Sequence, residues 1–394
     1  MDLTPPQLSP EPATNSLSPS ALDPPSPPLP PQSNPRRPRR TFVGPFGLRA
    51  GWSLLLYFAI LGAIAGGIFA IGHVVHVHRD HAAAAATLKA GKPAPPPSKS
   101  FFANRDGKKP QPVSALILGE GIAFLLYLLV SWLMALIERR KLSSYGLGGA
   151  HPIRRLLVGA FWGIAAISLL VLALHSFHLL TFDVRLDHGP SVVYFGALLL
   201  FGFLLVGLLE EYSFRGYIQF TLTRGLVSLG NRISPPHART IAFWIASFLT
   251  SAIFLAAHTQ NNGENALGLF QVFLAGVLFV VALWRTGALW WGIGFHMAWD
   301  WGQSFLYGVP DSGLLTQGRL FSTHANGNPL FSGGTVGPEG SVLCIPIFLL
   351  AIAVLFFTHP SPQPPLELPS APSHPDPQLS PFAQDLPDTS SAPA

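Results

Sequence analysis

Residues 191–220 read SVVYFGALLLFGFLLVGLLEEYSFRGYIQF, and this stretch decides how the chain folds. No charged residue interrupts it before Glu210, and about 20 apolar residues are enough for a helix to cross a bilayer. The run then reaches two adjacent carboxylates, Glu210 and Glu211, with Arg215 four positions later. An ionisable side chain in or beside hydrocarbon is costly unless it is paired or hydrated, so such residues usually mark function. The stretch therefore predicts a membrane helix that carries a functional site.

The composition of the whole chain agrees with a membrane protein. Of the 394 residues, 49% are hydrophobic and 11% are charged, whereas soluble domains average about 25% charged residues. Eight apolar stretches are long enough, or nearly so, to span a bilayer: 50–72, 113–137, 155–177, 191–212, 240–258, 267–285, 287–306 and 341–358. The alanine run at 82–86 is too short to count as a ninth. The fold class predicted is all-α, a polytopic transmembrane bundle of about eight spans.

Composition also divides the chain into segments. The two ends are rich in Pro and Ser and cannot bury enough apolar surface to fold, so we expect disordered, Pro-rich termini. A Gly-rich segment before the last span could cap a cavity from outside, although a connecting loop is the simpler interpretation. The predicted segments are a tail (1–45), three N-terminal spans (46–185), a core of four spans (186–306), the Gly-rich segment (307–340), a last span (341–358) and a second tail (359–394).

Basic residues indicate the orientation in the membrane. Arg36, Arg37, Arg39 and Arg40 precede the first span, and further Arg and Lys residues lie in the connections near 139, 154, 224, 239 and 285. All of these basic residues fall on the cytoplasmic side if both termini are cytoplasmic. Cytoplasmic connections usually carry an excess of Lys and Arg. The connection at 74–112 disagrees, because it carries seven Lys and Arg residues on the predicted outer face. The net charge of +5 is thus assigned to orientation and to anionic lipid, not to nucleic-acid binding.

Other general features narrow the class of protein. The first 30 residues contain no apolar run of the signal-peptide type, so we expect the first span to be an uncleaved anchor. The single cysteine, Cys344, excludes an internal disulfide framework.

Three short patterns recur at helical spacing in the second half. Glu210-Glu211-xxx-Arg215 places Glu211 and Arg215 on one helix face, where they can pair. Glu210 then points about 100° away and is free to accept a proton or a ligand. Phe254-xxx-His258 ends the fifth span, and His296-xxx-Asp300 lies in the seventh.

Together these patterns offer hydrolytic chemistry. Glu210, His258 and His296 could hold a zinc ion with an open water position, or could activate water without a metal. Glu210 is a suitable general base, and the remaining His and Asp could stabilise an oxyanion on a peptide carbonyl.

Simpler interpretations exist for each residue. A histidine in a span is often a packing contact, the Glu pair could reach cytoplasmic water, and Asp300 could belong to an interfacial belt with its neighbouring tryptophans. However, Glu120 is the main other ionisable residue in the spans. Such a concentration in three spans favours a site. His73, His76, His78 and His81 could bind a metal, but a solvated juxtamembrane stretch is the simpler interpretation.

The three motifs, in this order and in membrane spans, resemble the CPBP family of intramembrane proteases. That family joins type II CAAX prenyl endopeptidases, bacterial Abi proteins and bacteriocin-immunity proteins. The stretch EEYSFRGYIQF resembles the first motif of the family beyond its two Glu residues and Arg, since Phe214, Gly216 and Gln219 fit too. The resemblance covers roughly residues 190–306 and marks the 186–306 segment as the catalytic core.

The resemblance implies a role for each matching residue. Glu210 would activate the attacking water, with His258 sharing the task. Glu211 and Arg215 would pair to shape the first motif, and Phe254 would pack beside the site. His296 and Asp300 would stabilise the oxyanion. The last motif ends in Asp300 where many relatives have Asn, and a carboxyl group donates a hydrogen bond only when protonated.

Depth in the membrane is a constraint on this site. Antiparallel hairpin topology would place Glu210 and His258, both late in their spans, near opposite faces. The apolar character of the fourth span continues to about Leu222, so a longer helix would protrude or tilt and bring Glu210 nearer to mid-depth.

The sequence therefore predicts an intramembrane endopeptidase in a cell membrane, expected to be the bacterial inner membrane. Its predicted partners are lipid and a membrane-associated protein or peptide substrate, with docking through the Pro-rich tails as a further option. A cofactor would be a divalent metal such as zinc, or none. Two alternatives stay open: a proton-coupled transporter, because carboxylate and His relays also carry protons, and a non-catalytic membrane scaffold that keeps the protease fold.

Overall fold

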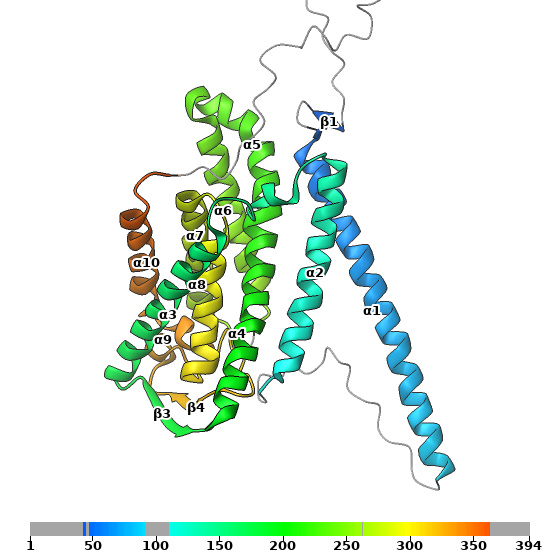
Figure 1. Cartoon of the computed structure of the whole chain (residues 1–394), viewed down its shortest axis with the longest axis vertical. Coiled ribbons are helices and arrows are strands. Elements are labelled where there is room, and N and C mark those ends of the chain that lie inside the picture. Colours follow the sequence, from blue (N-terminus) through cyan, green and yellow to red (C-terminus); the bar gives the residue numbers. More distant parts are fainter. Residues whose placement is uncertain (1–41, 45–46, 91–109, 262, 363–394) are drawn as a thin grey trace, which may run out of the picture. The chain divides into compact units, whose positions relative to one another are not determined.

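The computed structural model describes residues 42–44, 47–90, 110–261 and 263–362 (Figure 1). The predicted disordered tails, 1–45 and 359–394, lie outside the described residues except for 42–44 and 359–362.

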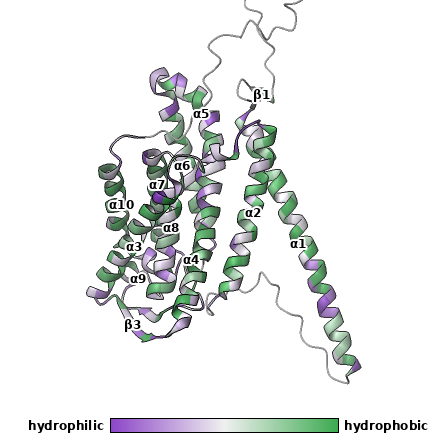
Figure 2. Ribbon diagram, viewed as in Figure 1, coloured by the Kyte–Doolittle hydropathy of each residue, from purple (hydrophilic) through white to green (hydrophobic). Residues whose placement is uncertain are grey.

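Long apolar helices dominate the described residues, and the ribbon of these helices is coloured hydrophobic over much of its length (Figure 2). Six helical stretches are long and apolar enough to cross a membrane: α1 (Ala50–Lys89), α2 (Val113–Ile137), α3 (Pro152–Ser176), Pro190–Ile233, Pro235–His258, which contains α6 (Ala238–His258), and α7 (Ala266–Thr286). The stretch α8 (Trp290–Trp301), which continues as η4 (Gly302–Tyr307), and α10 (Cys344–Thr358) are shorter. The chain is therefore an all-α integral membrane protein, as predicted, with two of the eight expected spans shorter than the rest.

Two helices are longer than their apolar runs. The first continues beyond residue 72 to Lys89 and includes the alanine run, because alanine has the highest helix propensity. The stretch Pro190–Ile233 is continuous over 44 residues, or about 66 Å at 1.5 Å per residue. It consists of α4 (Pro190–Glu210), the π-helical η2 (Glu211–Ile218) and α5 (Gln219–Ile233).

A small antiparallel sheet, absent from the sequence prediction, joins two connections. Strand β3 (Leu180–Arg185) follows α3, and it pairs with β4 (Phe321–Ala325) from the Gly-rich segment. The register matches Leu180 with Ala325 and Arg185 with Phe321. The Gly-rich segment, which also contains α9 (Pro329–Ser332) and η5 (Pro338–Gly340), is thereby attached to the α3–α4 connection.

Helix α8 packs against α3 at backbone distance. A Cβ added at Gly159 would lie 2.0 Å from the Trp291 carbonyl oxygen, and one at Gly163 would lie 2.3 Å from that of Phe295. From the other side, a Cβ at Gly294 would lie 2.0 Å from the Leu156 carbonyl oxygen. Gly159 and Gly163 form the small-xxx-small spacing that lets membrane helices approach closely. This contact fixes the height and rotation of the helix that carries His296.

Helices α1 and α2 are joined to the rest by a buried polar network. The Arg224 guanidinium in α5 donates to the Glu138 carboxylate after α2 at 3.1 Å and to the Ser53 hydroxyl in α1 at 2.9 Å. Tyr57 of α1 stacks on Tyr217 of η2, with ring centroids 4.2 Å apart. Two further short elements, η1 (Leu142–Tyr145) and η3 (Pro235–His237), form connections, and β1 (Val43–Gly44) pairs with β2 (Gly47–Leu48).

Candidate active site

A cavity of about 350 Å³ lies between the helices and brings the three motifs together. Its wall includes Glu210, His258, His296 and Asp300 from α4, α6 and α8. Apolar side chains such as Phe203, Phe254 and Phe279 form much of the remainder. The four titratable residues that the sequence placed in one site therefore face one shared space.

The π-helical turn shapes the first motif. Glu211 and Arg215 form an ion pair of 3.2 Å, and they are only 1% and 2% exposed. The Arg215 guanidinium lies over the Phe254 ring at 4.1 Å and over the Phe279 ring at 5.2 Å. Cation–π contacts of this kind are strongest where water is excluded. The pair thus joins η2 to α6 and α7 from inside the bundle.

His296 is the centre of the polar contacts. Its Nδ1 lies 3.2 Å from Oε1 of Glu211, the same oxygen that Arg215 contacts. Its Nε2 lies 3.7 Å from Oε2 of Glu210 and 3.6 Å from Oδ2 of Asp300. The ring also stacks on Phe279, with centroids 4.9 Å apart. Glu211 therefore does more than pair with Arg215: it orients the imidazole of the third motif.

The two longer contacts leave room for a reactant. A nitrogen–oxygen hydrogen bond is normally about 2.7–3.2 Å long, so at 3.7 Å neither Glu210 nor His296 is committed to the other. The Glu210 side chain is 25% exposed, whereas those of His296 and Asp300 are 11% and 7% exposed. A water or a carbonyl oxygen in the cavity can reach Glu210 and His296 together.

His258 is oriented by its own helix. Its Nδ1 lies 2.8 Å from the carbonyl oxygen of Phe254, one turn earlier. A carbonyl oxygen only accepts, so Nδ1 carries the proton and Nε2 of the neutral ring is left with a lone pair. The ring packs against Phe254 with centroids 4.4 Å apart.

The length of the α4–α5 stretch explains why Glu210 and His258 reach the same level. Glu210 lies 23 residues before the end of α5 at Ile233, and His258 lies 20 residues after the start of α6 at Ala238. The chain turns between Ile233 and Ala238, so the Glu210 and His258 side chains lie at a similar distance from this turn. Extension of the helix past Leu222 resolves the depth difference that a shorter hairpin would impose.

The sequence left open whether Glu210, His258 and His296 hold a zinc ion or activate water without a metal. Among the residues that the structure describes, Glu210, His258 and His296 do not form a group with one ligand atom each within 4.8 Å. His258 is held to its own helix, and His296 is turned toward Glu211 and Asp300. These orientations favour activation of water without a metal, the other option that the sequence left open.

Two acidic residues of the site were missed by the sequence interpretation. Asp311 and Glu339, the two acidic residues of the 307–340 segment, both line the cavity. Burial, and next the charge of Glu339, raise the pKa of Asp311 well above its ordinary range. The segment treated as a connecting loop thus forms one wall of the cavity. The indication available in the sequence was that these two acidic residues stand isolated among Gly, Ser and apolar residues.

Acidic residues dominate the charged groups of the cavity wall. Five carboxylates line it, from Glu120, Glu210, Asp300, Asp311 and Glu339. No Lys or Arg belongs to the lining among the described residues, and the two histidines are the other titratable groups there. Asp300, at 5% exposure, faces this interior rather than an interfacial belt.

Comparison with known proteins bears on the core. Residues 193–302 match the family model described as Type II CAAX prenyl endopeptidase Rce1-like. The match begins in α4, ends at the first residue of η4, and contains all six residues predicted for the site. No curated protein and no solved structure matches the chain. The resemblance identified from the three motifs is confirmed at the level of this match, which covers residues 193–302.

Proposed function

We propose that the protein is an intramembrane endopeptidase that hydrolyses a peptide bond of a membrane-associated protein or peptide. The observation that supports it best is the convergence of Glu210, His258 and His296, from three separate helices, on one cavity inside a bundle of membrane helices. The family match over residues 193–302 supports the same class of reaction.

Glu210 is the proposed general base. Its carboxylate is the most exposed of the three around His296, and apolar side chains surround the cavity. A water between Glu210 and the scissile carbonyl would lose a proton to the carboxylate as its oxygen attacks the carbon. The unprotonated Nε2 of His258 accepts a second hydrogen bond from that water and limits its orientation.

His296 is the proposed oxyanion donor. Glu211 accepts from Nδ1, so an Nε2 proton requires the imidazolium form, which donates from both nitrogens. Donors arranged before the reaction stabilise the charge that develops on the carbonyl oxygen. Asp300 lies on the Nε2 side of the ring and supports this protonated form. In this arrangement Asp300 positions His296 and need not donate to the oxyanion itself.

The proton taken by Glu210 completes the reaction. When the tetrahedral intermediate collapses, the carbon–nitrogen bond breaks and the leaving amine takes the proton from Glu210. The products are a new carboxyl terminus and a new amino terminus, and the site returns to its starting protonation.

Purified protein in liposomes, supplied with a membrane-anchored peptide, tests this function. Glu210→Ala is expected to lose cleavage by about 10²–10⁴-fold, the usual contribution of a general base. Glu264→Gln is the matched control, because Glu264 lies in the connection before α7 and does not line the cavity. Undiminished cleavage by Glu210→Ala would contradict the assignment. Proton uptake that survives the substitution, with no cleavage by wild type, would instead establish the transporter alternative.

A further inference from the structure

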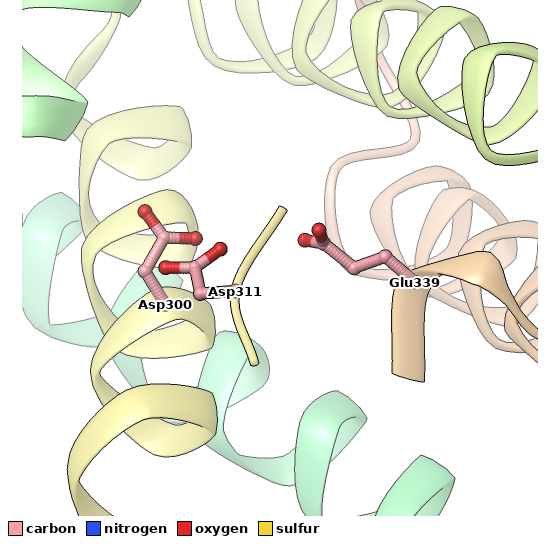
Figure 3. A group of neighbouring side chains, drawn as sticks. All are labelled: Asp300, Asp311 and Glu339. Atoms are coloured by element: carbon pink, nitrogen blue, oxygen red, sulfur yellow. The ribbon is translucent and has the colours of Figure 1, made fainter. Parts of the chain in front are cut away.

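Three carboxylates meet where α8 and the 307–340 segment close the cavity. Asp300 comes from α8, Asp311 follows η4, and Glu339 lies in η5. One oxygen from each lies within 4.8 Å of the others. Figure 3 shows the Asp300 and Asp311 carboxyl groups side by side, with Glu339 reaching toward them from the opposite wall. Like charges this close must be neutralised by protons or by a cation.

The described residues supply no permanent positive charge to this cluster. Asp300 forms an ion pair with His296, at 3.6 Å. In the described part of the chain, neither Lys nor Arg pairs with any of the three carboxylates. Asp311 and Glu339 are instead contacted by neutral donors. Gln303 Nε2 donates to both, at 3.2 and 3.1 Å, and Trp299 Nε1 donates to Glu339 at 2.9 Å.

Two buried neutral oxygens without a partner, one in the cavity wall and one on a residue that contacts the cluster, give an independent indication of a ligand. The Thr316 hydroxyl lines the same cavity, its residue is 4% exposed, and it has no hydrogen-bond partner in the described structure. Gln303 is 0% exposed, and its Oε1 also lacks a partner although its amide lies against Asp311 and Glu339. Buried polar atoms are normally satisfied, so each unpaired oxygen requires an explanation.

We infer that Asp300, Asp311 and Glu339 bind a hard divalent cation, best matched by Ca²⁺, with Gln303 Oε1 and Thr316 Oγ1 as further oxygen ligands. An all-oxygen set of carboxylates and neutral oxygens is what Ca²⁺ and Mg²⁺ select, whereas zinc prefers imidazole and thiolate. Ca²⁺ accepts several protein oxygens in a flexible geometry, whereas Mg²⁺ usually keeps several waters and is bound by one or two carboxylates. Three protein carboxylates with oxygens within 4.8 Å of one another therefore match Ca²⁺ better.

The cation would connect the 307–340 segment to the helix of the active site. Asp300 supplies a ligand and also lies beside His296, so the ion fixes a side chain next to the proposed oxyanion donor. The ligand Glu339 is already oriented by Trp299 and by the backbone N–H of Ser312, at 3.2 Å. Such outer contacts hold metal ligands in place. Asp311 and Glu339 lie outside the segment matched by the family, so the site goes beyond the proposed peptidase function.

Calcium binding to the purified, chelator-treated full chain in detergent tests the site directly. Isothermal titration with Ca²⁺ is expected to show one site, and Asp311→Asn and Glu339→Gln are each expected to weaken it by more than about ten-fold. Asp183→Asn is the control, because this exposed acid of β3 pairs with His324 away from the cavity and should leave binding unchanged. Glu210→Gln should also bind Ca²⁺ normally, which separates this site from the peptidase assignment.

If the two variants fail to fold, measurements on wild-type protein alone test whether Ca²⁺ binds. Ca²⁺ is expected to raise its thermal unfolding temperature, because a ligand that binds the folded state stabilises it. Absence of Ca²⁺ binding by wild type would show that protons neutralise the carboxyl groups and would overturn the inference. Binding that persists unchanged in folded Asp311→Asn and Glu339→Gln, or binding of Zn²⁺ in place of Ca²⁺, would also overturn it.

Discussion

At the scale of single residues, Glu211 is the link between the first and third motifs. One of its oxygens contacts both Arg215 and His296, at 3.2 Å each, in a position that is almost fully buried. The neighbouring Glu210 contributes to the cavity wall instead. Two adjacent carboxylates therefore have separate tasks, because the π-helical turn that begins at Glu211 directs one inward and leaves the other partly exposed.

Replacement of Glu211 should destabilise the protein more than replacement of an exposed charged residue. Glu211→Ala leaves the buried Arg215 without its ion-pair partner, and removing one member of a buried pair typically costs about 3–5 kcal/mol. The free energy of unfolding, measured by denaturant titration in detergent, should fall by this amount. The control Arg232→Met, at an exposed position of α5, should change it by less than about 0.5 kcal/mol. Equal effects of the two substitutions would show that the pair does not stabilise the fold.

The pairing of Glu211 with Arg215 could be predicted from their spacing of four residues, but the contact with His296 could not. The two residues are 85 positions apart in sequence, and their meeting depends on how α8 is rotated against α4. Likewise, the motif spacing gave no information on the Nδ1 contact of His258, although a histidine at the end of a helix can bond a carbonyl one turn earlier. For the same reason, residue type alone could not decide between a zinc ligand set and activation of water without a metal, because ring orientation determines which ligand atoms converge.

At the scale of elements, the close pair α3–α8 positions the site. Helix α3 contributes none of the six predicted site residues, yet its glycines allow α8 to approach at backbone distance. The apolar pattern was sufficient to predict α3 as a span. Its partner could not be identified from the pattern, because lipid-facing and helix-facing sides of a membrane helix are similarly apolar.

Gly163→Ala is expected to separate α3 from α8. The added Cβ would lie 2.3 Å from the Phe295 carbonyl oxygen, next to His296, and overpacking of this kind costs about 1–3 kcal/mol. Both the thermal unfolding temperature and the rate of peptide cleavage should fall. Gly66→Ala in α1 is the matched control, because a Cβ there meets nothing within 4 Å. If both alanine variants behave like wild type, α3 does not position the active site.

The tertiary contacts of the 307–340 segment could not be predicted from the sequence. Its glycines and short polar runs indicate a connection, and nothing in them predicts that β4 pairs with β3, about 140 residues earlier. Pairing across such a separation depends on the tertiary arrangement of the helices that carry the two strands. The two acidic residues of the segment were the available indication that it faces the cavity.

At the scale of the whole molecule, long apolar helices define an integral membrane protein. Composition and run length were sufficient to predict the fold class, since they reflect the thickness of hydrocarbon. They overestimated the length of the last two spans and underestimated α1 and α4–α5. Helix ends outside hydrocarbon are governed by local propensity and by tertiary packing, which hydropathy does not measure.

The proposed orientation, with both termini cytoplasmic, can be tested by cysteine labelling. Cys344 is the single cysteine and is buried, so an introduced cysteine at an exposed position reports its own side of the membrane. Asn231→Cys lies at the end of α5, and Ala325→Cys lies in β4. An impermeant maleimide should label Ala325→Cys in intact cells and Asn231→Cys only after permeabilisation. The reverse pattern would invert the proposed topology.

Incorporation of an oxygen isotope from the solvent tests whether Glu210 activates water for attack on a peptide bond. Cleavage of a membrane-anchored peptide by wild-type protein in H₂¹⁸O should place one ¹⁸O atom in the new carboxyl terminus, as read by mass spectrometry. Glu210→Gln should give no labelled product in the same time, while Glu264→Gln should match wild type. Labelled product formed by Glu210→Gln at the wild-type rate would show that Glu210 is not the general base. A wild-type product without ¹⁸O would show that water is not the nucleophile.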